Sequence, residues 1–390
     1  MLNRRTFLLT SLAATAGMLS GCSGSQNTLD VTFLQDSIPP QLLGDFQKII
    51  AQTGQIKLIP EVNLQAIFDL LEAWQKPDEQ EQSVIDSLPI IGRNNPQQAS
   101  IVTLGDSWLQ KAIADQLVQP LDTSKLEGWS SLPTRWQNLV KRDREGNLNA
   151  QGEVYGAPYR WGNTVIAYRK DKIAWTPTDW SDLWREELRG RISLLDDYRE
   201  VIGLTLKKLG HSYNTNNLSQ IPNLETELQQ LQQQVKFYSS DKYLQPLALG
   251  DTWLAVGWST DVLAITKRYS NIAVAVPASG TSLWADLWVQ PNLGDDTSSN
   301  EQIASIRANW MDFCWESKSA KQILLFTNAI SPISTKSQEQ GMQDLAPNLE
   351  NSPVLKSTLA TFNNSEFLSP LSPETKNEYS NLWKKIRQRG

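Results

Sequence analysis

The sequence predicts an α/β protein of two domains. Short apolar runs typical of strands alternate with amphipathic helices along most of the chain, and this alternation gives layered α/β architectures. The length that follows the N-terminal segment suits two domains of ordinary size. No second long apolar run appears, so we expect the body of the protein to be soluble.

The first half of the body reads as strands that each lead into a helix. Strands are expected at 29–34, 56–59 and 100–104. Helices are expected from Pro40 to Ile50, from Leu64 to Trp74 and from Trp108 to Gln116. Prolines open the first of these helices and Gly54 follows its end, as is common at helix termini.

The second half repeats this alternation with longer turns. Strands are expected at 161–169, 191–195, 255–258 and 272–276. Helices are expected at 201–209, 224–235 and 381–390, and the run IASIRANWMDFCW also has helical spacing. Cys314 lies within that run, which predicts a buried structural thiol.

The N-terminus reads as an export signal. Arg4 and Arg5 precede an apolar run from Phe7 to Leu19, which is too short to span a bilayer as a helix. The following Ser20-Gly21-Cys22 resembles a lipoprotein lipobox. We therefore expect a signal peptide over 1–21, a lipid on Cys22 and a tether over 22–28, on the outer side of a membrane. Both Sec and twin-arginine export remain open, as does the choice of inner or outer membrane.

Composition excludes several classes of function. The chain has 42 acidic and 36 basic residues and no dominant basic cluster, which argues against nucleic acid as a partner. It has one histidine, His211, and two cysteines, so a zinc site or a Ser-His-Asp triad is poorly supplied. We expect no metal, no cofactor and no catalysis.

Two acidic segments are candidates for binding a cation. In LWADLW, strand alternation puts Trp284, Asp286 and Trp288 on one face, so two indole rings would flank a carboxylate. The alternative is a half-buried strand with one solvated acid. In LLDDYREVIG, Asp197 and Glu200 follow a strand. They fit either a helix N-cap with a reciprocal carboxylate or a pair of acids that receives a cation.

Several segments together resemble the periplasmic spermidine/putrescine-binding proteins of ABC importers, within the bacterial family of extracellular solute-binding proteins. The segments, in chain order, are PPQLLGDF, YGAPYRWGNTVIAY, LLDDYREVIGLTLKKLGHS, AVGWSTDV and VAVPASGTSLWADLWVQP. The resemblance implies the two-lobed periplasmic-binding-protein fold (type II), with crossing hinge strands and a ligand in the cleft. Lobe one would hold 29–157 and 285–338, and lobe two 159–283 and 339–390. A monomer is expected, with an ABC permease and its ATPase as partners.

The resemblance also implies which side chains hold a polyamine-like cation. Asp197 and Glu200 would receive one amino group, and Trp258 would pack on the carbon chain. Trp284 and Asp286 would hold the other amine-bearing part, whereas Trp288 is assigned to packing.

On the lobe-one side the sequence departs from the family pattern. The aromatic residues that the family has just before IPPQLLGDF and in the loop that reads GDSW here are not matched in this sequence, and Ile330 stands where the family has a tyrosine. Possible substitutes are Asp36, Ser37, Asp106, Ser107 and Trp108. A cationic ligand is therefore better supported than spermidine itself.

Three alternatives remain open from the sequence. The same fold could bind another cation, such as a cationic amino acid, a thiamine-like cation or a metal complex. The protein could have lost its ligand and serve as an envelope partner. A thiaminase-like enzyme needs an activated nucleophile, and Cys314 lies in an apolar helix, so we expect this least.

Overall fold

A computed structural model describes residues 27–75, 98–294, 300–335 and 353–388 of the protein. The expected signal peptide and Cys22 lie outside these residues. The strands are β1 (Thr28–Leu34), β2 (Gln55–Glu61), β3 (Ile101–Gly105), β4 (Val118–Gln119), β5 (Lys141–Arg142), β6 (Glu153–Val154), β7 (Ala157–Arg169), β8 (Ile192–Leu194), β9 (Val235–Tyr238), β10 (Leu254–Trp258), β11 (Ile272–Ala275), β12 (Ser282–Pro291) and β13 (Glu366–Phe367). The helices are α1 (Pro40–Ile50), α2 (Leu64–Gln75), α3 (Asp106–Ala114), α4 (Thr134–Val140), α5 (Tyr198–Lys208), α6 (Leu224–Gln234), α7 (Leu244–Leu249), α8 (Ser259–Thr266), α9 (Glu301–Cys314), α10 (Ser317–Thr327), α12 (Pro353–Thr361) and α13 (Pro373–Gln388).

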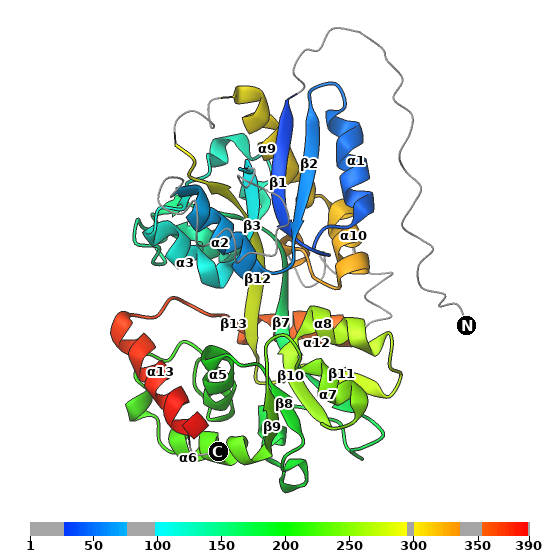
Figure 1. Ribbon diagram of the computed structural model, residues 1–390, viewed down its shortest axis with the longest axis vertical. Coiled ribbons are helices and arrows are strands. Elements are labelled where there is room, and N and C mark those ends of the chain that lie inside the picture. Colours follow the sequence, from blue (N-terminus) through cyan, green and yellow to red (C-terminus); the bar gives the residue numbers. More distant parts are fainter. Residues whose placement is uncertain (1–26, 76–97, 295–299, 336–352, 389–390) are drawn as a thin grey trace, which may run out of the picture.

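Two lobes lie one above the other, and β7 and β12 run from one into the other (Figure 1). Within the described residues, the main path of the large sheet has the order β2-β1-β3-β12-β7-β10-β8-β9. The first half of β7 pairs with β12, and its second half pairs with β10 and β11. These two long strands therefore carry residues of both lobes to one junction.

The upper lobe is built from parallel strands with helices around them. β1 pairs in parallel with β2 and β3, and β12 pairs antiparallel with β3. Figure 1 places α1 and α10 on one side of these strands and α2 and α3 on the other. This is the layered arrangement expected when strands lead into amphipathic helices.

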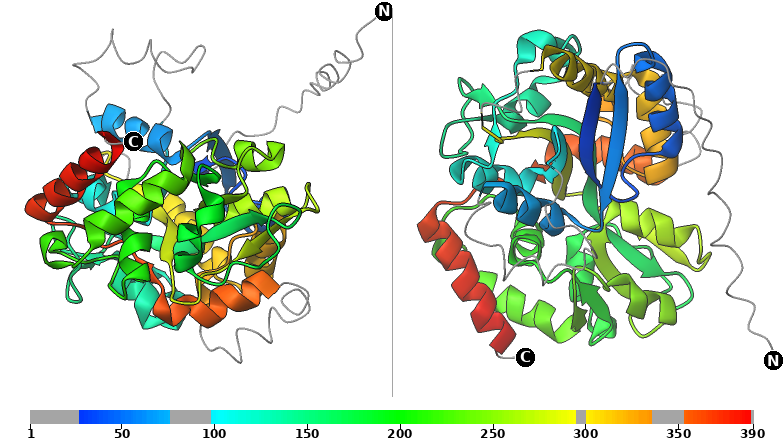
Figure 2. Two further views of the ribbon diagram at one scale, coloured as in Figure 1. Left: turned by 90° about the horizontal axis from the view of Figure 1, so that it is seen from below. Right: turned by 45° about the horizontal axis from the view of Figure 1, so that its top comes forward.

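The lower lobe repeats the design around β8 and β10, which pair in parallel. The C-terminal helix α13 packs against α5 and α6 and lies along the outer side of this lobe (Figure 2). Tyr379 of α13 is fully buried there, and Lys385 forms an ion pair with Glu225 at 2.6 Å. The chain end is thus held against the lower lobe.

Each lobe has its own apolar core. One cluster contains Phe33, Trp136, Tyr159 and Trp310, and a second contains Trp180, Tyr213 and Tyr379. The expected lobe boundaries stay a prediction. Leu355 and Leu359 of α12, which were expected in lobe two, belong to the first cluster.

The expected alternation of strands and helices is confirmed. Helices α4, α7, α8, α10 and α12 were not expected, and β7 begins at Ala157, before the expected 161. Helices α3, α5 and α13 begin earlier than expected, at Asp106, Tyr198 and Pro373. Polar first turns hide these starts, because apolar periodicity begins only where the helix meets the core. Among the described helices, none combines the length and the apolar character needed to cross a bilayer.

Candidate functional site

Asp197 and Glu200 lie at the start of α5, where Asp197 caps the helix and Glu200 does not. The Asp197 carboxylate accepts hydrogen bonds from the backbone N–H groups of Arg199 and Glu200, at 2.7 and 3.3 Å. Asp197 is therefore the N-cap of α5. The reciprocal half of the expected capping box is absent here, because the Glu200 side chain turns toward the crossing strands instead.

The Glu200 carboxyl group joins α5 to both crossing strands. Ser282 of β12 donates a hydrogen bond to Oε2 at 2.7 Å, and Thr164 of β7 donates one to Oε1 at 3.1 Å. The side chain is 6% exposed. Burial, and then the nearby charge of Asp197, raise the pKa of Glu200 to about 7. Two hydroxyl donors therefore hold a carboxyl group that can gain or lose a proton near neutral pH.

Asp286 forms an ion pair with Arg160 across the two crossing strands. Nε and Nη2 of Arg160 each lie 2.6 Å from Oδ2 of Asp286. Arg160 is 6% exposed and Asp286 is 3% exposed. Burial lowers the pKa of Arg160, but the Asp286 carboxylate and the Tyr159 hydroxyl together outweigh it, and the pKa is raised overall. Burial raises the pKa of Asp286, and the charge and hydrogen bond of Arg160 oppose this. With two donors at 2.6 Å, the geometry favours the ionised carboxylate. The pair is therefore a buried and charged one.

The indole of Trp284 lies beside this ion pair. The Arg160 guanidinium carbon is 5.7 Å from the centre of the Trp284 ring, within the range of a cation–π contact. Gly162 allows the indole its place, because a Cβ there would overlap Trp284 and Ser259. Trp284 is half-buried and packs against the core of the upper lobe.

Trp258 stands at the opposite side of the junction, as the N-cap residue of α8. Tyr243 contacts Trp258 in two ways. The two rings lie edge to face with centres 6.1 Å apart, and the backbone N–H of Trp258 donates a hydrogen bond to the Tyr243 hydroxyl at 3.1 Å. That hydroxyl in turn donates to Asp261 at 2.9 Å. The Asp261 residue is exposed as a whole, but burial of its carboxyl group beside Tyr243 raises its pKa, and the charge of Arg160 opposes the rise.

The expected lobe-one contacts divide into buried and exposed groups. Ser37 is fully buried and accepts a hydrogen bond from the Tyr159 hydroxyl at 3.1 Å. Asp106 is buried and accepts a hydrogen bond from the Ala285 N–H at 2.9 Å. Burial raises the pKa of Asp106 to about 7, and the charge of Asp286 adds to the effect. Both residues thus lie in the buried network around the ion pair.

The other three expected lobe-one residues lie nearer the surface. Asp36 is exposed in the turn after β1, with a φ of 62° that places it in the left-handed region. Ser107 is exposed in the first turn of α3. Trp108 is half-buried and packs on Phe68 with ring centres 4.9 Å apart, so its contact joins α3 to α2.

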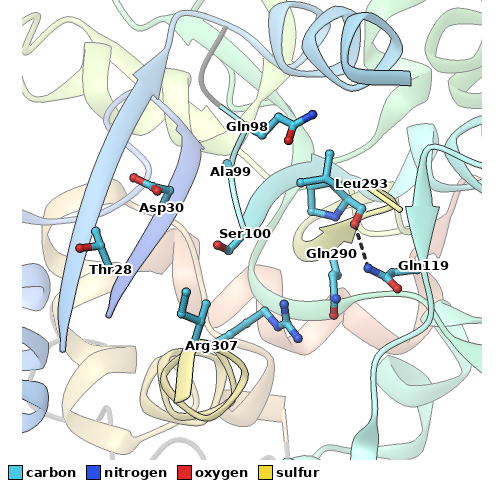
Figure 3. Close-up of a pocket in the computed structure, with 11 residues that line it drawn as sticks. Thr28, Asp30, Gln98, Ala99, Ser100, Gln119, Gln290, Leu293 and Arg307 are labelled. Carbon is cyan, nitrogen blue, oxygen red and sulfur yellow. Dashed lines mark hydrogen bonds between the residues drawn. The ribbon is translucent and has the colours of Figure 1, made fainter. Parts of the chain in front are cut away.

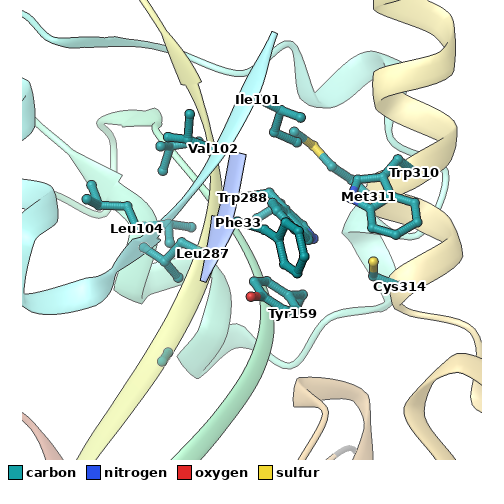
Figure 4. Close-up of a cluster of buried hydrophobic side chains, with 14 of the residues drawn as sticks. Phe33, Ile101, Val102, Leu104, Tyr159, Leu287, Trp288, Trp310, Met311 and Cys314 are labelled. Carbon is teal, nitrogen blue, oxygen red and sulfur yellow. The ribbon is translucent and has the colours of Figure 1, made fainter. Parts of the chain in front are cut away.

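The register of β12 against β3 is uninterrupted from Asp286 to Val289, but its pairing with β7 is irregular. The register with β7 shifts between Asp286 and Leu287, which is a bulge. Trp288 is fully buried and stacks on Tyr159 at 4.3 Å, with Trp310 at its edge (Figure 4). The expectation that Trp288 serves packing is confirmed. The extra residue of this bulge is Tyr159 of β7, so the alternation along β12 is not altered, and the common face expected for Trp284, Asp286 and Trp288 stays a prediction.

Cys314 is buried among the same apolar side chains, as its helical spacing predicted (Figure 4). Burial raises the pKa of the Cys314 thiol to about 12. A thiol in that environment is not a nucleophile at neutral pH.

Sequence reasoning missed Arg160, Tyr243 and Asp261. Arg160 is a charge within YGAPYRWG, between aromatic residues that enter the core. A charge in such a run indicates a buried partner, and this signal was available in the sequence. The role of Tyr243 depends on how α7 lies against β10 and has no local signal.

A cavity of about 250 Å³ lies elsewhere, between β1, β3, β12 and α9 (Figure 3). Its lining includes Ser100, Gln290 and the half-buried Arg307. It contains none of the predicted site residues. Among the described residues, no cluster of histidine, cysteine or acidic side chains could hold a metal ion.

Comparison with known proteins gives one family and a consistent set of relatives. Residues 97–355 match the family described as "Bacterial extracellular solute-binding protein". The spermidine/putrescine-binding periplasmic protein of Escherichia coli K12 is 26% identical over 280 residues, which cover 72% of each chain. The putrescine-binding periplasmic protein PotF of the same strain is 24% identical over 298 residues, again 72% of each chain.

The fold has the same kind of relatives among solved structures. The spermidine/putrescine ABC transporter substrate-binding protein PotD from Streptococcus pneumoniae superposes with a TM-score of 0.74. The superposition covers 93% of this chain and 98% of that one, at 20% sequence identity. This similarity confirms the two-lobed periplasmic-binding-protein fold.

Proposed function

Because the chain belongs to the family of bacterial extracellular solute-binding proteins, we propose that it captures a polyamine-like organic cation between its lobes. It then delivers this cation to the permease and ATPase of an ABC importer. The names of the curated relatives, which bind spermidine or putrescine, support this cargo class. The family binds solutes and is not a family of enzymes, which agrees with the inert setting of Cys314.

The acids at the start of α5 carry the proposal. Within the described part of the chain, neither Asp197 nor Glu200 forms an ion pair with a lysine or arginine side chain. Glu200 is buried and Asp197 is half-buried, and the nearby charge of Arg199 offsets only part of the burial effect on their pKa values. Buried acids without an ion-pair partner are held at a free-energy cost. An ammonium ion at this position supplies the missing partner.

The strength of such a site follows from ordinary magnitudes. Each charge-assisted hydrogen bond contributes roughly 1.5–3 kcal/mol, and each buried methylene about 0.8 kcal/mol. Trp258 and Trp284 supply the apolar faces for the carbon chain. The exposed Asp36, in the turn after β1, and the exposed Asp261, near the start of α8, would attract the cation as it enters.

We propose that the predicted export signal directs the protein to the periplasmic side of a membrane. The periplasmic location given in the relatives' names supports that placement. We infer that Cys22 carries the lipid anchor and that 22–28 forms the tether. Replacement of Cys22 by serine is expected to move the protein from the membrane fraction to the soluble fraction, and unchanged membrane retention would exclude the lipid anchor.

The direct test is calorimetric titration of the purified protein with spermidine, putrescine, N-acetylputrescine, arginine and thiamine. We expect micromolar or tighter binding of at least one aliphatic amine, and at least about tenfold weaker binding in Asp197→Asn. Asp241→Asn is the matched control, because Asp241 is an exposed acid of the same lobe. Absence of binding to every aliphatic amine would refute the proposed cargo.

A further inference from the structure

The ion pair between Arg160 and Asp286 occupies the place that the sequence assigned to a ligand amine. In the sheet, Asp286 of β12 lies directly opposite Arg160 of β7 on one side and opposite Gly105 of β3 on the other side. Both charged groups are almost fully buried, and two nitrogens of Arg160 lie 2.6 Å from one carboxylate oxygen. The same guanidinium lies over Trp284. One side chain of the protein therefore uses both the acid and an indole face.

A second ammonium ion at this position gains little from Asp286. Any cation that approaches the carboxylate also approaches the guanidinium, and attraction and repulsion at similar distances offset each other. Displacement of Arg160 is also unfavourable, because it would leave a buried guanidinium without its carboxylate. The position therefore accepts an uncharged group more readily than a positive one.

We propose that Arg160 is a specificity-determining residue, which limits the cargo to amines with one ammonium end and an uncharged polar end. This inference rests on the proposed function and narrows its substrate class. The ammonium end lies at Asp197 and Glu200, neither of which forms an ion pair with a lysine or arginine among the described residues. The uncharged end lies against the Arg160–Asp286 pair, and a diamine is disfavoured there.

Putrescine and N-acetylputrescine test the proposal, because they share one ammonium end and differ at the other, where a neutral and larger acetamide replaces the second ammonium. Calorimetric titration of the purified wild-type protein is expected to show N-acetylputrescine bound at least about tenfold more tightly than putrescine. Arg160→Gln frees Asp286 for an ammonium, so the affinity for putrescine is expected to rise about tenfold or more. The preference between the two ligands then reverses.

Two control variants separate this role from a general effect of charge. Arg307→Gln removes one positive charge at the separate cavity on α9 and is expected to keep the wild-type preference. Arg160→Lys keeps the positive charge beside Asp286 and is expected to keep the preference as well. If Arg160→Gln does not fold, the wild-type ratio and the Arg160→Lys ratio still decide the question.

The possible outcomes distinguish this inference from the function on which it rests. Wild-type protein that binds putrescine as tightly as N-acetylputrescine, or more tightly, overturns the role of Arg160 and leaves the importer function standing. A ratio that Arg160→Gln does not change overturns it as well. Failure of both amines to bind any variant overturns the role of Arg160. If spermidine, arginine and thiamine also fail to bind, the proposed function is overturned too.

Discussion

Replacement of Glu200 by glutamine is expected to change how the stability of the protein depends on pH. The carboxyl group is buried between Thr164 and Ser282, and its pKa is raised from an ordinary 4.5 to about 7 by burial and by Asp197. In the unfolded chain the group ionises near its ordinary value. The folded protein therefore holds a proton that the unfolded chain has released.

The sign and size of the effect follow from this difference. Below pH 4.5 both states are protonated, and the favourable contribution of the neutral carboxyl is fully present. As pH rises from 4.5 to about 7 this contribution is lost, because the folded state alone keeps the proton. At about 1.36 kcal/mol for each pKa unit, the loss amounts to about 3 kcal/mol. Glutamine fills the same space, can accept and donate a hydrogen bond, and does not titrate.

The assay is urea unfolding followed by tryptophan fluorescence at pH 5 and pH 8, for wild-type protein and Glu200→Gln. We expect the variant to gain up to about 3 kcal/mol relative to wild type between the two pH values. Asp106 also has a pKa raised to about 7, but it is present in both proteins and cancels in the comparison. Glu186→Gln is the control, because that side chain is 83% exposed. Equal pH dependence in wild type and variant would refute the argument.

Three further predictions concern the junction and the core beside it. Asp286→Ala leaves the charge of Arg160 buried and unpaired, so the free energy of unfolding should fall by about 3–5 kcal/mol. The double variant Arg160→Leu/Asp286→Leu should recover most of this loss in urea unfolding. Failure to recover it would contradict the pairing. Trp288→Ala removes the ring that stacks on Tyr159 and should lower the free energy of unfolding by about 3–5 kcal/mol. Trp288→Phe keeps an aromatic ring and should lower it by less. Equal losses in the two variants would argue against a packing role. Gly162→Ala places a Cβ where Trp284 and Ser259 lie, so near-ultraviolet circular dichroism should change and amine affinity should fall; an unchanged spectrum would show that the indole does not depend on this glycine.

Much of the fold follows from local sequence signals. The strand expected at 29–34 is β1 (Thr28–Leu34), and the helix expected from Leu64 to Trp74 is α2 (Leu64–Gln75). These elements carry periodic apolar residues that enter the core, so their period gives both type and position. The start of α5 was placed late because Tyr198, Arg199 and Glu200 are not part of an apolar stripe, although Asp197 gives a clear N-cap signal.

The polar junction was predicted less completely, because its contacts depend on strand register. The bulge opposite Asp286 and Leu287 has Tyr159 of β7 as its extra residue, and the alternation along either strand alone cannot reveal it. Asp286 and Arg160 are 126 residues apart, so their pairing likewise requires the register of β12 against β7. The sequence identified the acid correctly as a group that needs a cation, but that cation lies within the chain.

The two acidic positions of the junction therefore differ in what they offer to a ligand. Asp286 already has a guanidinium within 2.6 Å, and its charge is matched inside the protein. Glu200 has two hydroxyl groups and no ion-pair partner in the described structure, and burial together with the charge of Asp197 raises its pKa to about 7 although the charge of Arg199 opposes this. A bound ammonium ion would stabilise the ionised form of Glu200 much more than that of Asp286, because only Asp286 already has an ion-pair partner. The direction in which an amine lies across the junction follows from this difference, with its charged end toward α5 and its other end toward the crossing of β7 and β12.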